Sequence, residues 1–375
     1  MGIIYNEKAK TFTLHTQNTT YQMQIDAYGF LLHLYYGRKT DGVMDYLLTY
    51  ADRGFSGNPH DTGNDRTYSL DVLPQEFPCR LTGDFRSPVL DLVNADGSFG
   101  CDLRYQGYEI CDGKYNLKGL PAVYAAEEEA QTLIIYMKDQ VTGLQVELLY
   151  GVLPEYDVIT RSAKVINTEE DKIRLTKAQA ACIDFVHGEF DVISFYGRHA
   201  MERNMQRTSV GHGAFVIGSR RGTSSHQYNP MMILAEKETT EDAGTCYGMS
   251  FVYSGGFKAE VEKDQFGQTR IQMGLQEEQF SYPLKKGEEF VIPEVILTCS
   301  NQGLEKLSQN LQRCIRKNLC RGKYKEKVRP VLINSWEACY FDFTGEDIYH
   351  LAEQAKDLGI DMVVLDDGWF GSRND

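Results

Sequence analysis

PVLINSW (330–336) and DMVVLDDGW (361–369) are the two runs that decide the fold of the C-terminal part of the chain. Each contains an apolar stretch with β-branched residues, VLI (331–333) and MVVL (362–365), which predicts strands. Between them, four apolar residues recur at the spacing of one helix face: Ile348, Leu351, Ala355 and Leu358. The pattern predicts a βαβ unit with a helix over about 345–358 and two parallel strands. Because two parallel strands alone bury too little, we expect them to begin a larger parallel sheet or barrel that the sequence does not complete.

Both predicted strands end in residues that suit the binding of a sugar. The first ends in NSWE (334–337) and the second in DDGW (366–369). In enzymes built from βαβ units, the ligand lies at the carboxyl ends of the strands. Carboxylates accept hydrogen bonds from neighbouring hydroxyls, and aromatic rings cover the C–H face of a sugar. The candidate sugar-binding residues are therefore Trp336, Asp366, Asp367 and Trp369.

The same residues also fit other interpretations. Asp366 or Asp367 could cap the following helix, and Trp336 and Trp369 could be packed at the rim of a barrel. The paired aspartates could also hold Mg²⁺. From the local pattern alone, a structural role and a metal site both stay open. No G-x-S-x-G elbow, P-loop or dinucleotide-binding glycine motif occurs in the sequence, which argues against triad hydrolases, nucleotide enzymes and redox enzymes.

The chain before residue 300 is dominated by strand patterns. From Thr11 to about Thr298, short alternating or β-branched runs are separated by turn residues, and a QNTT turn (17–20) predicts an early hairpin. This spacing predicts a large antiparallel sandwich. Residues 52–86, rich in Gly, Asn, Asp and Pro, interrupt the rhythm and are expected to form a long ordered loop, a kind of segment that often carries function.

A helix is expected after Gly303, where the apolar period changes to that of a helix. Its apolar face is formed by Leu304, Leu307, Leu311, Ile315 and Leu319. The following stretch to Arg329 is basic. Because the whole chain is acidic, we interpret this stretch as a solvated linker rather than a nucleic-acid patch.

Composition excludes several classes of partner. Asp and Glu (53) outnumber Lys and Arg (39), and the formal net charge of −14 disfavours nucleic acid. Neither a signal-peptide pattern nor a run of about 18 apolar residues is present, so we expect neither secretion nor membrane insertion. The nine cysteines form no C-x-x-C pair and the eight histidines lack ligand spacing, which favours a cytoplasmic location without a metal site.

Several segments resemble, in the same order, those of the α-galactosidases of glycoside hydrolase family 36. They are DRGFSGNP (52–59), DRTYSLDVLPQEFP (65–78), TGDFR (82–86), SRRGTSSHQYNP (219–230), NSWEA (334–338) and LDDGWFGSRND (365–375). The resemblance implies an N-terminal β-supersandwich, here 1–300, joined by a helical linker, 301–329, to the first βαβ unit of a catalytic (β/α)8 TIM barrel, 330–375. The rest of the barrel and a C-terminal β-domain would follow.

The resemblance also implies an activity. Family members hydrolyse terminal α-galactosyl bonds of melibiose, raffinose and stachyose with retention, without a metal or cofactor, and some are tetramers. Trp336 resembles the tryptophan of the galactose subsite, and Asp366 and Asp367 resemble the aspartates that bind galactose O4 and O6. Asp52 and Arg66 lie in the loop that, in tetrameric members, reaches a neighbouring subunit's active site.

No catalytic residue is expected within this sequence. In the family the nucleophile is the aspartate of a K-W-D motif on a later barrel strand, and another aspartate further on is the acid/base. Neither motif occurs between Met1 and Asp375. Nothing in the sequence places acidic residues of the β-part, such as Asp184, at the mouth of a barrel. We therefore expect both catalytic aspartates beyond Asp375 and no turnover by this chain. The alternative is a non-catalytic galactose-binding or oligomerisation module.

Overall fold

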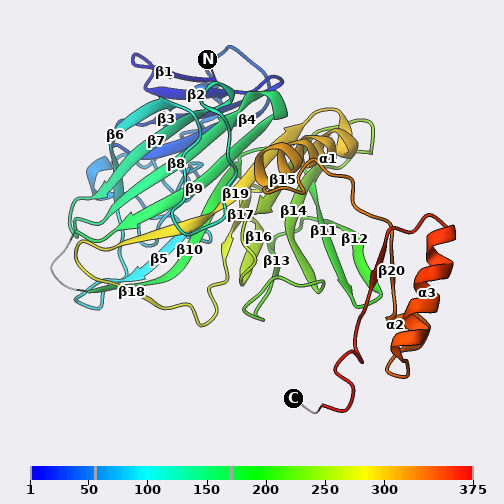
Figure 1. Ribbon diagram of the computed structural model, residues 1–375. Coiled ribbons are helices and arrows are strands. Elements are labelled where there is room, and N and C mark those ends of the chain that lie inside the picture. Colours follow the sequence, from blue (N-terminus) through cyan, green and yellow to red (C-terminus); the bar gives the residue numbers. More distant parts are fainter. Residues whose placement is uncertain (1, 55–56, 169–171, 374–375) are drawn as a thin grey trace. The chain divides into compact units, whose positions relative to one another are not determined.

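The computed structural model describes residues 2–54, 57–168 and 172–373, which form two compact units (Figure 1). The N-terminal unit extends to Leu319 and the C-terminal unit begins at Cys320. Each unit is described by itself. Among the described residues, no helix combines the length and the apolar character needed to cross a membrane.

The largest sheet of the N-terminal unit, as far as its residues are described, has nine antiparallel strands in the order β12-β11-β14-β15-β19-β9-β8-β7-β6. In chain order these are β6 (Leu103–Asp112), β7 (Gln131–Asp139), β8 (Gln145–Leu153), β9 (Val158–Ile166), β11 (Phe190–Arg198), β12 (Met201–Ser209), β14 (Tyr228–Glu236), β15 (Cys246–Phe251) and β19 (Glu289–Ser300). In β7, the buried Leu133, Ile135 and Met137 alternate with less buried residues, because successive strand side chains point to opposite faces. The predicted antiparallel β architecture is confirmed.

Two further antiparallel sheets complete the β-structure of the described N-terminal residues. A six-stranded sheet has the order β13-β16-β17-β10-β18 with β5 also on β10, and a four-stranded sheet has the order β1-β2-β3-β4. Their strands are β1 (Ile3–Asn6), β2 (Thr11–His15), β3 (Thr19–Ile25), β4 (Leu31–Arg38), β5 (Leu90–Val93), β10 (Ile173–Phe185), β13 (Gly213–Gly218), β16 (Phe257–Lys263), β17 (Thr269–Leu275) and β18 (Tyr282–Leu284). The hairpin predicted around residues 17–20 is the β2–β3 pair.

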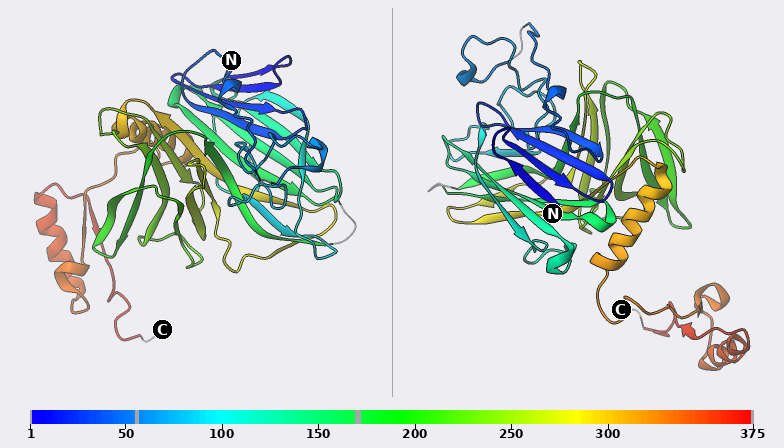
Figure 2. Two further views of the ribbon diagram at one scale, coloured as in Figure 1. Left: turned by 180° about the vertical axis from the view of Figure 1, so that it is seen from behind. Right: turned by 90° about the horizontal axis from the view of Figure 1, so that it is seen from above.

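The segment between β4 and β5 is a long ordered connection, as predicted for residues 52–86 in the part that is described. It contains only single 3-10 turns, η1 (Asp45–Leu47) and η2 (His60–Thr62), among its described residues. Its second half is nevertheless buried from Tyr68 to Cys79. In Figure 2 this segment is drawn in lighter blue, mostly as loops, next to the darker blue strands of the N-terminal unit. Its burial requires that its polar backbone and side chains find partners inside the unit.

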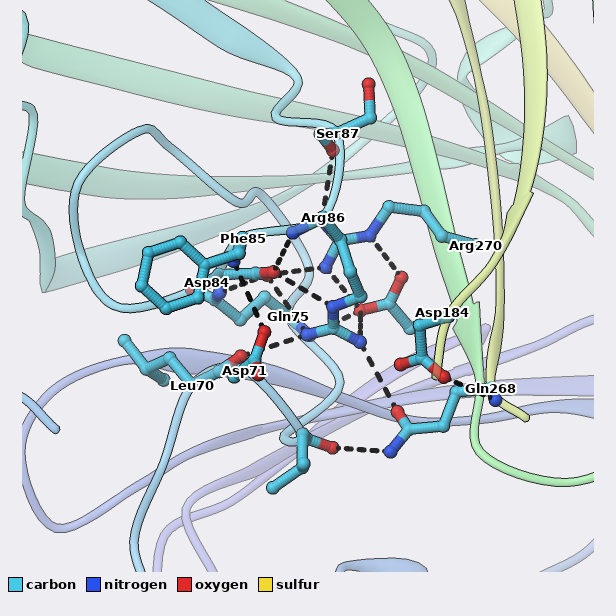
Figure 3. Close-up of polar contacts among 12 residues, drawn as sticks. Leu70, Asp71, Gln75, Asp84, Phe85, Arg86, Ser87, Asp184, Gln268 and Arg270 are labelled. Atoms are coloured by element: carbon cyan, nitrogen blue, oxygen red, sulfur yellow. Dashed lines mark hydrogen bonds and ion pairs between the residues drawn. The ribbon is translucent and has the colours of Figure 1, made fainter. Parts of the chain in front are cut away.

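A buried ion-pair network supplies many of these partners (Figure 3). It consists of Asp84 and Arg86 of the segment, Asp184 of β10 and Arg270 of β17. Arg270 Nε and Nη2 lie 2.6 Å from Asp184 Oδ1 and 2.7 Å from Asp84 Oδ2. Arg86 Nε lies 2.9 Å from Asp84 Oδ1, and Arg86 Nη1 lies 3.3 Å from Asp184 Oδ2. Two carboxylates and two guanidinium groups therefore neutralise one another away from water.

The same network fixes the backbone of the segment. Arg86 Nη2 donates hydrogen bonds to the carbonyl oxygens of Leu70 (2.9 Å) and Leu73 (2.8 Å). The backbone N–H of Gln75 donates to Asp184 Oδ2 at 3.0 Å. These bonds connect the middle of the segment to its end and to β10, which explains how a chain without regular structure stays ordered.

The helix predicted after Gly303 is confirmed as α1 (Gly303–Cys314), which continues as a π-helical turn, η5 (Ile315–Leu319). Leu307, Leu311 and Cys314 are buried in one cluster with residues of β9, β14 and β19. The helix thus packs on the nine-stranded sheet and is part of the N-terminal unit (Figure 1). The other short 3-10 turns are η3 (Glu127–Glu129) and η4 (Pro154–Tyr156).

The C-terminal unit contains the predicted strand, helix and strand. Strand β20 (Leu332–Asn334) pairs in parallel with β21 (Met362–Val364), and α2 (Trp336–Cys339) and α3 (Gly345–Asp357) lie between them in sequence. Thr344 caps α3, since its hydroxyl accepts from the backbone N–H of Asp347. The apolar pattern predicted that Leu358 belongs to the inward face of this helix, and this is wrong: Leu358 is 79% exposed and lies at the C-cap, directly after α3 ends at Asp357.

Candidate functional site

The carboxyl ends of β20 and β21 lie side by side in the C-terminal unit. The parallel register pairs Asn334 with Val364, so the residues that follow each strand start from the same edge. The Ser335 backbone N–H donates to the Val364 carbonyl at 3.0 Å, which continues the strand pairing by one residue. The two sequence motifs that were predicted to meet at a strand edge are therefore neighbours.

Asp366 is held at this edge by the end of the neighbouring strand. Asn334 Nδ2 donates to Asp366 Oδ2 at 2.7 Å, and the Asp366 backbone N–H donates to Ser335 Oγ at 3.1 Å. Asp366 is half-buried, whereas the Asp367 side chain is exposed. The Asp367 backbone N–H donates to Asp366 Oδ1 at 2.8 Å. The Asp366 carboxylate is thus oriented by neutral groups and has no basic side chain among these contacts.

Trp336 stands at the start of α2 on the same edge. Its backbone N–H donates to Asn334 Oδ1 at 2.8 Å, so the Asn334 amide contacts both Trp336 and Asp366. The indole meets the rings of Tyr340 and Phe341 edge to face, with centroids 5.2 Å and 4.9 Å away. The ring is half-buried and fixed by these contacts.

Trp369 follows the two aspartates after a change of chain direction. Gly368 has φ +96°, and a Cβ there would lie 2.8 Å from the Phe343 ring, so this position requires glycine. The Trp369 ring is 62% exposed and contacts Phe370 and the Arg373 guanidinium, whose carbon lies 5.0 Å from the ring centroid. These contacts do not link Trp369 to Trp336.

Asp52 and Arg66 form an ion pair with each other in the N-terminal unit. Arg66 Nη2 lies 3.2 Å from Asp52 Oδ1, and the two side chains are 63% and 49% exposed. Arg66 also donates to the Gly54 carbonyl at 3.3 Å, and Asp52 Oδ1 accepts from the Gly54 N–H at 2.8 Å. The pair therefore closes a small surface turn. The other candidate residues belong to the C-terminal unit.

Asn334 and Ser335 are the site residues that sequence reasoning missed as contributors. Both lie in the motif that ends the first predicted strand, and parallel pairing places that motif beside the second strand's end. Their position in that motif places them near the aspartates, although the hydrogen bonds they make depend on side-chain geometry. In the described part of the chain, no three His, Cys, Asp or Glu side chains are placed to share a metal ion.

Asp184, the carboxylate of the β-part considered as an alternative acid, is built into the ion-pair network. Burial by itself raises the pKa of Asp184, but Arg270 and Arg86 outweigh this effect and lower that pKa from 3.8 to about 2. All of its neighbours in the network are buried as well. Asp184 is therefore a buried carboxylate of the scaffold.

Comparison with known proteins identifies the family. Residues 29–285 match the family profile described as glycosyl hydrolase family 36 N-terminal domain, and residues 289–375 match the profile described as melibiase. The chain belongs to glycosyl hydrolase family 36. The family resemblance seen in the sequence motifs is thereby confirmed.

Curated family 36 relatives match the whole chain. It is 64% identical over 375 residues to the bifunctional alpha-galactosidase/sucrose kinase AgaSK of Mediterraneibacter gnavus, covering 100% of this chain and 40% of that protein. It is 43% identical over 375 residues to alpha-galactosidase Mel36A of Lactobacillus acidophilus, covering 100% of this chain and 51% of that protein. The family 36 chain therefore spans about half the length of these relatives.

Solved structures agree with this assignment. The galactosidase domain of AgaSK superposes with a TM-score of 0.96 at 64% identity, covering 100% of this family 36 chain and 52% of that domain. A variant of the family 36 alpha-galactosidase AgaA from Geobacillus stearothermophilus, solved in complex with raffinose, superposes with a TM-score of 0.94 at 42% identity. That match covers 98% of this chain and 51% of the AgaA chain.

Proposed function

We propose that this chain is part of an α-galactosidase that hydrolyses terminal α-D-galactosyl residues of melibiose, raffinose and stachyose with retention. The observation that carries the proposal is the shared edge of β20 and β21, where Asn334 contacts both Trp336 and Asp366. Relatives at 64% and 43% identity are named as α-galactosidases, and AgaA variants have been solved with raffinose and with stachyose. These names support the same activity for the complete protein.

In this proposal the strand edge binds the galactosyl ring. Asp366 and Asp367 accept hydrogen bonds from its O4 and O6 hydroxyls, and Trp336 covers an apolar C–H face. A hydrogen bond to a charged group contributes about 1.5–3 kcal/mol, and the contact to O4 favours galactose over glucose because the two sugars differ only in configuration at C4. The exposed Trp369 adds a second aromatic face. Asp52 and Arg66 act on the site of a neighbouring subunit in a homo-oligomer, proposed to be a tetramer.

Catalysis in this proposal belongs to residues after Asp375. Retention needs a nucleophilic carboxylate and an acid/base carboxylate about 5–5.5 Å apart, with a covalent glycosyl-enzyme between the two steps. We place both on later strands of a (β/α)8 barrel whose first βαβ unit is 330–375, after a β-supersandwich (1–300) and a helical linker (301–329). The proposed enzyme is cytoplasmic and needs no metal or cofactor.

The turnover test uses nitrophenyl α-galactoside. The 375-residue chain is expected to release no nitrophenol, whereas the complete protein hydrolyses the substrate. An open reading frame that continues to a Lys-Trp-Asp motif would agree with this expectation. Turnover by the 375-residue chain that disappears in Asp366→Ala would show that the chain carries its own catalytic residues. It would contradict the proposal that both catalytic carboxylates lie after Asp375.

The binding residues are tested in the complete protein. Asp366→Asn is expected to lower kcat/KM for the galactoside about 10- to 150-fold, the equivalent of one charged hydrogen bond. Asp361→Asn is the matched control, because Asp361 is an exposed carboxylate that precedes β21 at its opposite end. Equal activity of the Asp366 and Asp361 variants would show that the strand edge does not bind the substrate.

A further inference from the structure

A hollow lies within the N-terminal unit and has no part in the function proposed above. It has a volume of about 470 Å³. Its described lining comes from the loop after β13 (219–222), the β15–β16 turn (253–256), the end of β17 with the following turn (275–280) and Phe290 of β19. Small-molecule sites usually measure about 300–1,000 Å³, so the hollow is large enough for one or two sugar rings.

Three aromatic side chains line this hollow. Tyr253, Phe280 and Phe290 line it, and all three are half-buried, so part of each ring faces the hollow. The ring centroids of Phe280 and Phe290 are 5.7 Å apart, and Tyr282 packs on Phe290 at 4.6 Å. Rings held in this way present flat apolar faces of the kind that cover the C–H side of a pyranose.

Polar side chains that include both signs of charge also line the hollow. Arg220 and Glu278 form an ion pair at the rim, with Gln276 and Gln279 nearby in the lining. Gln276 is held in place, because its Nε2 donates to the Phe257 carbonyl at 3.3 Å and its Oε1 accepts from the Glu278 N–H at 3.2 Å. Hydrogen-bond donors and acceptors therefore line the same hollow as the aromatic rings, while the charges of Arg220 and Glu278 compensate each other.

Two glycines allow the walls to approach so closely. A Cβ on Gly255 would lie 2.2 Å from Cε1 of Tyr253, so only glycine lets this ring rest against the turn. A Cβ on Gly256 would lie 3.1 Å from the Ser219 carbonyl oxygen and 3.3 Å from Cβ of Gln276. The position of the Tyr253 ring therefore depends on the absence of a side chain at Gly255, and a single methyl group there would displace the ring.

We propose that this hollow is a saccharide-binding subsite of the N-terminal unit, separate from the β20–β21 edge. Its occupant is a neutral hexose or short oligosaccharide. A lining that combines aromatic rings with hydrogen-bonding side chains fits a ring with one apolar and one hydroxylated face. A phosphorylated or otherwise anionic ligand fits less well, because Arg220 is paired with Glu278 and the chain carries a net charge of −14.

The test titrates the 375-residue chain with raffinose, methyl α-galactoside and maltose by calorimetry, with ligand-observed NMR to detect weak binding. The background is Asp366→Ala/Asp367→Ala, which removes the carboxylates of the strand edge. At least one of these sugars is expected to bind this background. In it, Tyr253→Ala and Gly255→Ala are expected to weaken binding about tenfold or more, and Glu278→Gln about fivefold.

Tyr108→Ala is the matched control, since Tyr108 is a partly exposed tyrosine of β6 outside the hollow, and its binding should equal that of the background. Glu278→Gln changes an exposed side chain and keeps the test valid if a Tyr253 variant is poorly folded. The subsite is refuted if no sugar binds the Asp366/Asp367 background, or if the Tyr253, Gly255 and Glu278 variants bind as the background does. Because the strand edge is inactivated throughout, neither result bears on the α-galactosidase proposal.

Discussion

Two groups of aspartates in this family 36 chain have opposite surroundings. In the N-terminal unit, Asp84 and Asp184 are buried and each contacts the guanidinium groups of Arg86 and Arg270. In the C-terminal unit, Asp366 is half-buried against the neutral Asn334 and Ser335, and Asp367 is exposed. The first pair has its charge fully compensated within the protein. The second pair has only neutral groups among these contacts, so burial with basic partners distinguishes the scaffold carboxylates from those of the candidate site.

The largest expected effect comes from breaking the buried network. Arg270→Met keeps most of the side-chain volume but leaves Arg86 as the single network cation beside two buried carboxylates. We expect the free energy of unfolding to fall by about 3–5 kcal/mol, measured by urea denaturation. Arg66→Met, at an exposed ion pair, is the control. A loss below about 1 kcal/mol in Arg270→Met would mean that the network contributes no more than a surface pair.

A smaller loss of unfolding free energy is expected when the pH is lowered. The pKa of Asp184 is lowered to about 2 from its ordinary 3.8, so the stabilisation is complete above about pH 4 and is lost as the pH falls towards 2. The shift corresponds to about 2 kcal/mol. Between pH 4 and pH 2 the parent should therefore lose about that much more unfolding free energy than Asp184→Asn, measured by urea denaturation at each pH. Parallel pH profiles for the two proteins would contradict this.

At the strand edge, the expected effect concerns activity rather than stability. Asn334→Ala removes the amide that contacts both Asp366 and Trp336. In the complete protein we expect kcat/KM for a galactoside to fall about five- to tenfold, with unfolding free energy unchanged within about 0.5 kcal/mol. Gln354→Ala, at an exposed position of α3, should change neither quantity. Full activity of the Asn334 variant would show that its hydrogen bonds do not orient the site.

The smallest expected effect is on the stability of the surface pair. Arg66→Met removes a contact between two side chains that are 63% and 49% exposed. The loss in unfolding free energy should stay below about 1 kcal/mol and should shrink in high salt, because solvent and ions screen exposed charges. A loss comparable to that of Arg270→Met would overturn the distinction between the two aspartate environments.

Periodicity predicted the local elements well, because each depends on residues close in sequence. The β2–β3 hairpin, helix α1 and the strand–helix–strand order of the C-terminal unit all followed from patterns a few residues long. Leu358 continues the helical spacing of apolar residues, but its side chain is exposed and follows the last residue of α3. Sheet order could not be predicted, since β10 pairs with β5, β17 and β18 from distant parts of the chain.

For the candidate site, the sequence predicted which motifs lie at the ends of the two strands, but not the side-chain contacts between them. Parallel pairing brought the two motifs to one edge, as their sequence positions indicated. The bridging role of Asn334 depends on side-chain geometry that spacing alone does not define. The partners of Asp184 were equally hidden, because Arg86 and Arg270 meet it only through the folding of three separate segments.

The buried ion-pair network also limits how this sequence can evolve. Asp84 and Arg86 lie in one segment, while Asp184 and Arg270 lie on strands far along the chain. Losing any one of them leaves an opposite charge unpaired in the interior. A variant that carries only the first of two compensating substitutions is therefore poorly folded. Among homologues these four positions should therefore be inherited as a set, and a lineage that discards one should have replaced its partners as well.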